Sequence, residues 1–115
     1  MPTKRLEGDQ MCMRIYIGEK DKYQGRPLYK AILDYLKKSD IAGATVYRAM
    51  AGYGPNSYFR TVNILSLSVD LPVVVEVVDD PIKIEKVLLG LDKMIPAGMI
   101  TLQEVHVLTY KTEKG

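Results

Sequence analysis

The segment Gly52-Tyr53-Gly54-Pro55-Asn56 follows a predicted strand and carries residue types that suit an anion-binding site. Glycines lack a Cβ, so the backbone N–H groups beside them can approach a charged ligand closely. The same residues are also common in ordinary turns. This segment is therefore either a plain turn or the lip of a ligand site, and the residues alone leave both interpretations open.

Acidic residues follow the first predicted strand and lie in or after the third: Glu19 and Asp21, then Glu76, Asp79 and Asp80. Paired carboxylates can do general acid–base work. Asp79 and Asp80 precede Pro81, however, an arrangement typical of helix capping, which we favour. Glu76 interrupts the apolar run "VVVEVV", so its charge must reach solvent or a partner, for which Arg48 is one candidate. A structural pair and a ligand-facing site both remain open for these two residues.

Cys12 and His106 are the single cysteine and the single histidine of the chain. One cysteine excludes an intramolecular disulfide, and the two residues do not form a cluster of metal ligands. We expect His106 to be an ordinary residue on a sheet face or edge, and Cys12 to be a small hydrophobic residue in the first strand. Neither has a predicted nucleophile–base partner, so the sequence predicts no metal site and no catalytic residue.

The elements that must position these residues follow from hydrophobic periodicity. Strand patterns cover residues 11–18, 44–51, 71–79 and 99–110, and helical spacing follows Pro27 and Pro81. The order is βαβ, a long insertion, then βαβ. It predicts an α+β fold, a ferredoxin-like βαββαβ sandwich with a long loop between strands two and three and both helices on one face. The other sheet face must be covered or used.

Length and composition limit the class of protein. The 115 residues suit one domain, with a core at about residues 12–110 and flexible tails at 1–10 and 111–115. The net charge of +2 does not favour nucleic-acid binding, and an RNA-recognition module would need aromatic residues on both central strands. No apolar run approaches the roughly 20 residues of a membrane helix, so we expect a cytoplasmic protein without membrane insertion.

Three motifs carry a resemblance to a known family: "IGEKDKYQGRPLY", "AGATVYRAMAGYG" and "DLPVVVEVVD". With them, the sequence resembles an uncharacterised family of PII-like proteins (domain of unknown function 190, UPF0166 type), related to the PII nitrogen-regulatory proteins. The resemblance implies a homotrimer that binds adenine nucleotides in clefts between subunits. It also implies that the 53–70 loop contacts a client protein, such as a transporter or an enzyme.

The resemblance also assigns residues to the nucleotide. Gly52, Tyr53 and Gly54 match the glycine-rich base of the PII loop near the phosphates. Asn56 falls at the position of a ligand-contacting glutamine, and Thr45 resembles a threonine near the adenine. One extra residue before Gly52 shifts the register of that last match.

Other positions depart from the PII pattern and change the expected ligand. In the turn after the second helix, Gly98 is followed by Met99 where PII proteins carry a phosphate-binding lysine, and the C-terminal arginines are missing. Each charge-assisted contact contributes about 1.5–3 kcal/mol, so we expect AMP or ADP to be favoured over ATP. Further residues could supply charge or support: Arg48, Arg60, Lys20, Lys22 and Glu76.

Three functions fit this sequence. The first is a nucleotide-responsive regulatory trimer that requires no cofactor, which we favour. The second is a small enzyme that uses Glu76 and Arg48, or the 18–25 loop, on a phosphorylated or anionic metabolite. The third is a trimeric interaction scaffold without a small ligand. Product analysis after incubation with ATP and ADP would separate a binder from a hydrolase.

Overall fold

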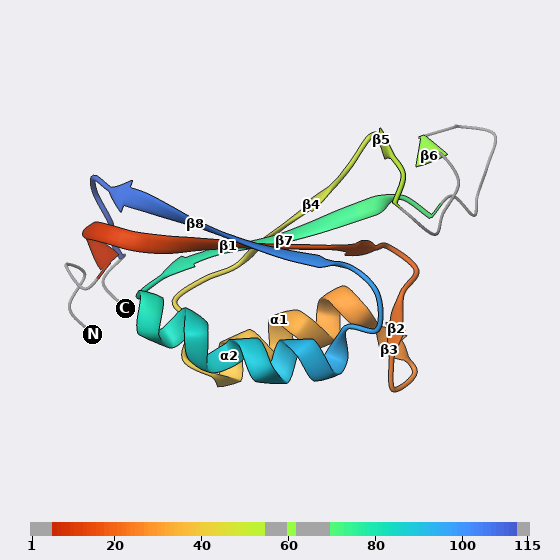
Figure 1. Cartoon of the computed structure of the whole chain (residues 1–115), viewed down its shortest axis with the longest axis horizontal. Helices are drawn as coiled ribbons and strands as arrows, with labels where there is room; N and C mark the ends of the chain where they lie inside the picture. The colour runs from red at the N-terminus through yellow and green to blue at the C-terminus, as the bar shows by residue number, and fades with distance from the viewer. Residues whose placement is uncertain (1–5, 55–59, 62–69, 113–115) are drawn as a thin grey trace.

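A four-stranded antiparallel sheet with two helices against one face forms the protein, as the computed structural model shows for residues 6–54, 60–61 and 70–112 (Figure 1). The strands of this sheet lie in the order β4-β7-β1-β8. Their bounds are β1 Gly8–Gly18, β4 Thr45–Arg48, β7 Pro72–Asp79 and β8 Met99–Val107. The helices are α1 Leu28–Lys38 and α2 Pro81–Met94. Two short pairs complete the described elements: β2 Lys22–Tyr23 with β3 Arg26–Pro27, and β5 Ala51–Gly52 with β6 Arg60–Thr61.

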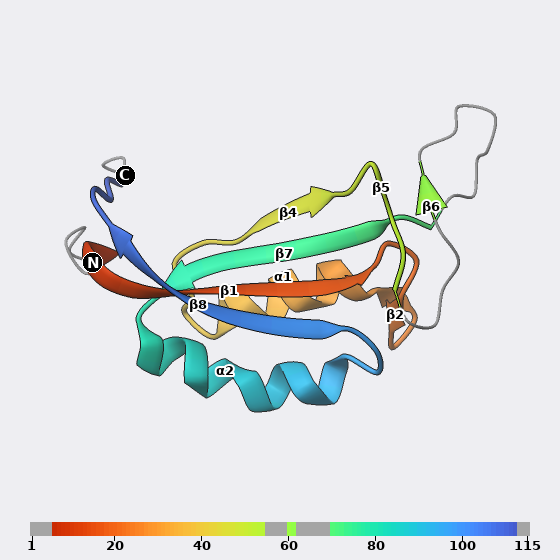
Figure 2. The same ribbon diagram turned by 45° about the horizontal axis from the view of Figure 1, so that its top comes forward.

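The predicted ferredoxin-like arrangement is confirmed, because the first and third main strands are central and both helices cover the same face (Figure 2). Several boundaries differ from the prediction. Strand β1 begins at Gly8, so residues 8–10 belong to the sheet and not to an N-terminal tail. The strand predicted at 44–51 ends at Arg48, and the chain then forms the separate β5–β6 pair. The last strand ends at Val107, and Pro27 stands at the N-cap position of α1, directly before the helix.

The core lies between the helices and the sheet face that they cover. Alternate residues of the two central strands point into it, and Met13, Ile15 and Val75 are fully buried there. Leu28 and Ile32 supply the facing side of α1 at helical spacing. The apolar periodicity of the sequence is thus the pattern that packs these layers together.

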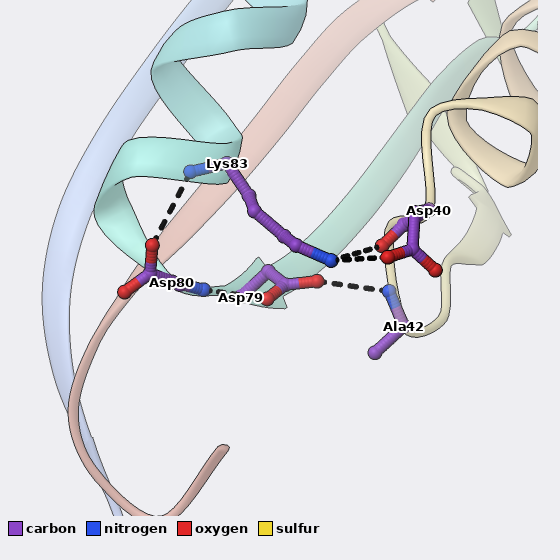
Figure 3. A network of polar contacts seen from close by, with 5 residues as sticks. All are labelled: Asp40, Ala42, Asp79, Asp80 and Lys83. Carbon is purple, nitrogen blue, oxygen red and sulfur yellow. Dashed lines mark hydrogen bonds and ion pairs between the residues drawn. The ribbon is translucent and has the colours of Figure 1, made fainter. Parts of the chain in front are cut away.

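Asp79 and Asp80 have structural roles at the start of α2 (Figure 3). The Asp80 carboxylate accepts hydrogen bonds from the backbone N–H groups of Ile82 and Lys83, which confirms the predicted helix cap. Asp79 is fully buried and accepts hydrogen bonds from the N–H groups of Asp80 and Ala42, at 2.6 and 2.8 Å. The bond to Ala42 fastens the segment before β4 to the end of β7, next to the start of α2.

Lys83 adds an ion pair to this network. Its ammonium group donates to the carboxylate and to the backbone carbonyl of Asp40, at 2.6 and 2.9 Å (Figure 3). Asp40 adopts a positive φ of 64° at the end of the turn after α1. The pair therefore holds the exit of the first helix against the start of the second.

The second face of the sheet has no helix over it among the described residues (Figure 1). Along β7, residues 73, 75 and 77 are buried against the helices, whereas Val74, Glu76 and Val78 on the other face are only half-buried. We call this second surface the open face. None of the described helices is long and apolar enough to cross a membrane.

Candidate functional site

Most of the residues predicted to bind nucleotide gather at one end of the sheet. Strands β1 and β4 end there, at Gly18 and Arg48, and strands β7 and β8 begin there, at Pro72 and Met99. Gly18 pairs with Pro72, and Met99 pairs with Tyr16 two residues before the end of β1. We call this region the loop end, because the long insertion leaves the sheet and returns to it here.

Gly52 lies against the ring of Pro72 at the loop end. A Cβ at position 52 would lie 2.9 Å from Pro72 Cγ, closer than real side chains approach. Gly52 also pairs with Arg60 in the short β5–β6 ladder. The side chain of the next residue, Tyr53, is 74% exposed. The first glycine of the motif is thus required for packing, and it brings the backbone of this segment close to the start of β7.

Gly98 makes a similar close approach from the turn after α2. A Cβ at this position would lie 2.5 Å from the backbone carbonyl oxygen of Tyr16. The neighbouring Met99 begins β8 with more than half of its side chain exposed. Both glycine segments therefore reach the same end of the sheet, as a shared binding region requires.

Arg48 does not pair with Glu76, which corrects that part of the prediction. Arg48 lies opposite Val73 in the β4–β7 register, and its Nε donates to the carboxylate of Glu19 at 3.1 Å. Glu76 lies opposite Thr45, on the other face of the sheet. Successive residues of a strand point to opposite faces, so positions 48 and 76 could not meet. Arg48 and Glu76 are therefore not side by side, as a catalytic site built from the two residues would require.

The loop after β1 joins both roots of the long insertion. The backbone N–H of Glu19 donates to the carbonyl of Leu71 at 2.8 Å, and that of Lys20 donates to Asp70 Oδ1 at 2.9 Å. Asp21 accepts a hydrogen bond from Gly18 N–H at 2.9 Å. Lys20 and Lys22 are exposed, as expected of residues that could meet a phosphate. This loop positions charged groups of both signs at the loop end.

A polar network crosses the open face from edge to edge of the sheet. Glu76 accepts a hydrogen bond from the Tyr47 hydroxyl at 2.5 Å and forms an ion pair with Arg14 Nε at 2.8 Å. Arg14 also donates to Gln103 at 2.9 Å. Thr45 is exposed beside Glu76. Thr45, on the edge strand β4, and Glu76 therefore lie midway along the length of the sheet, away from the glycine segments.

Hydrogen bonding within this network shifts the pKa values of its members. The Tyr47 hydroxyl, and then Arg14, lower the pKa of Glu76 against the opposing effect of burial. The hydrogen bond to Glu76 raises the pKa of Tyr47 and that of Arg14. Arg14 and Tyr47 were not predicted as partners of Glu76. The available signal was a second charge in an apolar strand, Arg14 in "MCMRIYIG".

Some predicted positions lie outside the described residues. Asn56 is one of them, together with most of the 53–70 loop. For Arg60 the structure describes the backbone pairing with Gly52.

Cys12 and His106 take the ordinary places predicted for them. Cys12 is buried, and this burial raises the pKa of its thiol. His106 lies on the edge strand β8, with Nδ1 2.9 Å from a carboxylate oxygen of the exposed Asp9. Among the described residues, no group of three or more histidines, cysteines and carboxylates is arranged to hold a metal ion.

A surface hollow of about 530 Å³ lies at the opposite end of the sheet from the glycine segments. Its lining comes from β1, β8 and the start of α2: Asp9, Gln10, Met11, Pro81, Glu104, Val105 and His106. None of the residues predicted to bind nucleotide lines it.

Comparison with known families identifies the group to which the chain belongs. The family model DUF190, described as "Uncharacterized ACR, COG1993", matches residues 10–107. This protein is a member of the DUF190 family. The resemblance seen in the sequence motifs is thereby confirmed.

Two curated relatives of this DUF190 protein carry the name UPF0166 protein. One, from Aquifex aeolicus, is 40% identical over 96 residues, which cover 84% of this chain and 90% of the relative. The other, from Methanocaldococcus jannaschii, is 41% identical over 102 residues, 88% of this chain and 92% of the relative.

Solved structures of a PII-like protein share the fold of this DUF190 protein. CPII from Thiomonas intermedia K12, described as a nitrogen regulatory PII-like protein bound to ADP, AMP and bicarbonate, aligns with a TM-score of 0.66 at 14% identity. The alignment covers 86% of this chain and 88% of CPII. A second CPII structure, bound to ADP and bicarbonate, aligns with a TM-score of 0.62 over the same shares. This likeness confirms the PII-like ferredoxin fold.

Proposed function

We propose that this DUF190 protein is a regulatory protein that binds an adenine nucleotide at the loop end, with AMP or ADP favoured over ATP. The observation that carries the proposal is the close backbone packing of Gly52 on Pro72 and of Gly98 on Tyr16, at the same end of the sheet. This packing brings both glycine segments to one region, and glycine-lined backbone of this kind can let N–H groups approach a phosphate. The fold shared with CPII, whose structures hold ADP and AMP, supports the same ligand class.

The charges at the loop end support a ligand with few phosphates. Met99 offers no cation beside Gly98, and Arg48 shares its charge with Glu19. Lys20 and Lys22 are exposed residues just after the end of β1. A triphosphate carries more charge than these groups can neutralise, whereas a monophosphate or diphosphate needs fewer partners.

We also propose that the nucleotide binds in clefts of a homotrimer and that the 53–70 loop contacts a client protein. The open face supports an assembly, because Tyr16, Val74 and Val78 lie there half-buried and without a helix over them. A small domain buries a limited share of its surface by itself, so a partner copy on this face would add apolar burial. Light scattering coupled to size exclusion would show three copies if this assembly forms.

A binding role is favoured over an enzymatic one by the positions of the charged residues. One form of the enzyme hypothesis combined Glu76 with Arg48, which lie on opposite faces of the sheet, and the other used the 18–25 loop. Glu76 is instead satisfied by Tyr47 and Arg14. We therefore expect ATP and ADP to be recovered intact after incubation with the protein.

Calorimetric titration with AMP, ADP and ATP tests the proposal. We expect binding of AMP or ADP in the micromolar to millimolar range, and Arg48→Gln should weaken it by about tenfold because a charge-assisted contact is lost. Lys38→Gln is the matched control, since Lys38 is an exposed cation paired with Asp34 on the outside of α1. Its affinity should stay within about twofold of the parent. If none of the three nucleotides binds, the proposal is wrong.

A further inference from the structure

Glu19 holds the main cation of the loop end in an ion pair. Both oxygens of its carboxylate lie 3.1 Å from Arg48 Nε. The Glu19 side chain is 30% exposed, against 55% for that of Arg48, so the carboxylate is the more enclosed partner. A phosphate that uses Arg48 must therefore share it with Glu19 or displace the carboxylate.

The backbone on either side of Glu19 fixes its position. Its own N–H donates to the carbonyl of Leu71, and the next N–H, that of Lys20, donates to Asp70. The Asp21 carboxylate accepts a hydrogen bond from Gly18 N–H. The Asp21 backbone carbonyl accepts a second one from Leu28 N–H at 2.7 Å, which links this loop to the start of α1. These backbone hydrogen bonds therefore hold Glu19 in position beside Arg48.

Two further carboxylates lie close to Glu19. Asp21 Oδ1 and Asp70 Oδ1 lie 3.0 and 3.3 Å from the point where a Cβ on Gly18 would be. Both therefore crowd the last residue of β1, next to Glu19 in the chain. Negative charge from three side chains is concentrated where strand β1 ends and β7 begins.

We propose that Glu19 determines how many phosphate charges the nucleotide site accepts. This inference rests on the proposed function and names the residue that sets its selectivity. Glu19 offsets the charge of Arg48, and Asp21 and Asp70 add negative charge that opposes the attraction of Lys20 and Lys22 for an approaching anion. Coulomb repulsion grows with the charge of the ligand, so the cost is larger for a nucleoside triphosphate than for a monophosphate. The site thereby selects nucleotides with one or two phosphates.

Calorimetric titration of Glu19→Gln with AMP, ADP and ATP tests this assignment. Glutamine keeps the shape and one acceptor oxygen but removes the charge. We expect the affinity for ATP to rise by about tenfold and that for AMP by about threefold or less. The control is Asp34→Asn, which removes one negative charge from the outer surface of α1, where Asp34 pairs with Lys38. All three affinities of this control should stay within about twofold of the parent.

The outcomes separate this inference from the proposed function. If the parent binds AMP or ADP and Glu19→Gln changes all three affinities equally, or changes none, the role of Glu19 is refuted and the nucleotide site stands. If neither protein binds any nucleotide, both proposals fail. Circular dichroism checks that the variant is folded. Should Glu19→Gln be unfolded, Asp21→Asn provides the same test. The inference is then refuted if the gain in affinity for ATP is equal to or smaller than the gain for AMP.

Discussion

The two faces of the sheet are built from the same strands and have opposite characters. On the covered face, Val73, Val75 and Val77 of β7 are buried against the helices. On the open face, the same strand presents Val74, Glu76 and Val78, and Glu76 belongs to the Tyr47–Glu76–Arg14–Gln103 network. A near-continuous valine run thus serves two surfaces. The covered face is stabilised by apolar packing, and the open face carries a network of hydrogen-bonded polar side chains.

The difference teaches that β-branched composition alone does not show which side of a strand is buried. A run such as "VVVEVV" is typical of a central strand covered on both faces or against a partner copy. In the described part of the chain, the helices cover one face only. The charge in the run marks the other face, because a carboxylate needs hydrogen-bond partners wherever it is even partly buried.

The largest expected effect contrasts two valines that are neighbours in β7. Val75→Ala should lower the free energy of unfolding by about 2–3 kcal/mol, because two buried methyl groups are lost and a cavity remains. Val74→Ala removes the same atoms from the half-buried open face and should cost about 1 kcal/mol or less in the isolated chain. Urea denaturation of both variants measures the difference. Equal losses would mean that the open face is as fully buried as the core.

A smaller effect should come from breaking the polar network. Glu76→Ala removes the acceptor of Tyr47 and the ion-pair partner of Arg14, and should lower the free energy of unfolding by about 1–2 kcal/mol. Glu104→Ala is a suitable control, because Glu104 is an exposed carboxylate on β8. Its effect should stay within about 0.5 kcal/mol. Thermal unfolding compares the two variants. If Glu76→Ala and Glu104→Ala lose the same amount of stability, the polar network does not stabilise the protein.

The network should also make the stability of the protein depend on pH. The hydrogen bond from Tyr47 holds the pKa of Glu76 below its ordinary value of 4.5 in the folded state. A lowered folded-state pKa means that the stabilisation is complete above the unfolded-state value and is lost as the pH falls through the folded-state value. The stability difference between the parent and Glu76→Gln should therefore shrink below about pH 4.5. A difference that is constant from pH 3 to 7 would contradict this linkage.

The smallest effect should follow from Tyr47→Phe. This change removes one hydroxyl that donates to Glu76 and leaves the ring in place. We expect a loss of about 0.5–1.5 kcal/mol in the free energy of unfolding. The pKa of Glu76 should move upward in carbon-detected NMR titration, because its first stabilising partner is gone. An unchanged titration would show that Arg14 alone holds the carboxylate.

Local patterns in the sequence determined the elements and the core of this protein. Strand alternation placed Met13 and Ile15 inside, helical spacing placed Leu28 and Ile32 against them, and Asp80 before Pro81 predicted the cap of α2. These features depend on residues within a few positions of each other, so one sequence is enough to read them. The motif resemblance added the family and the glycine positions at the loop end.

Only the tertiary structure decided which charged residues are partners. Arg14 and Glu76 are 62 positions apart, and Glu19 and Arg48 are 29 apart. Strand register brings Arg14 and Glu76 together, and a shift of one residue would place Glu76 on the helix-covered face instead. Arg48 is a candidate partner of Glu76 from the sequence because their strands are neighbours, but pleating turns the two side chains to opposite faces. The sequence fixes the period of each strand, whereas pairing between distant strands exists only once the chain has folded.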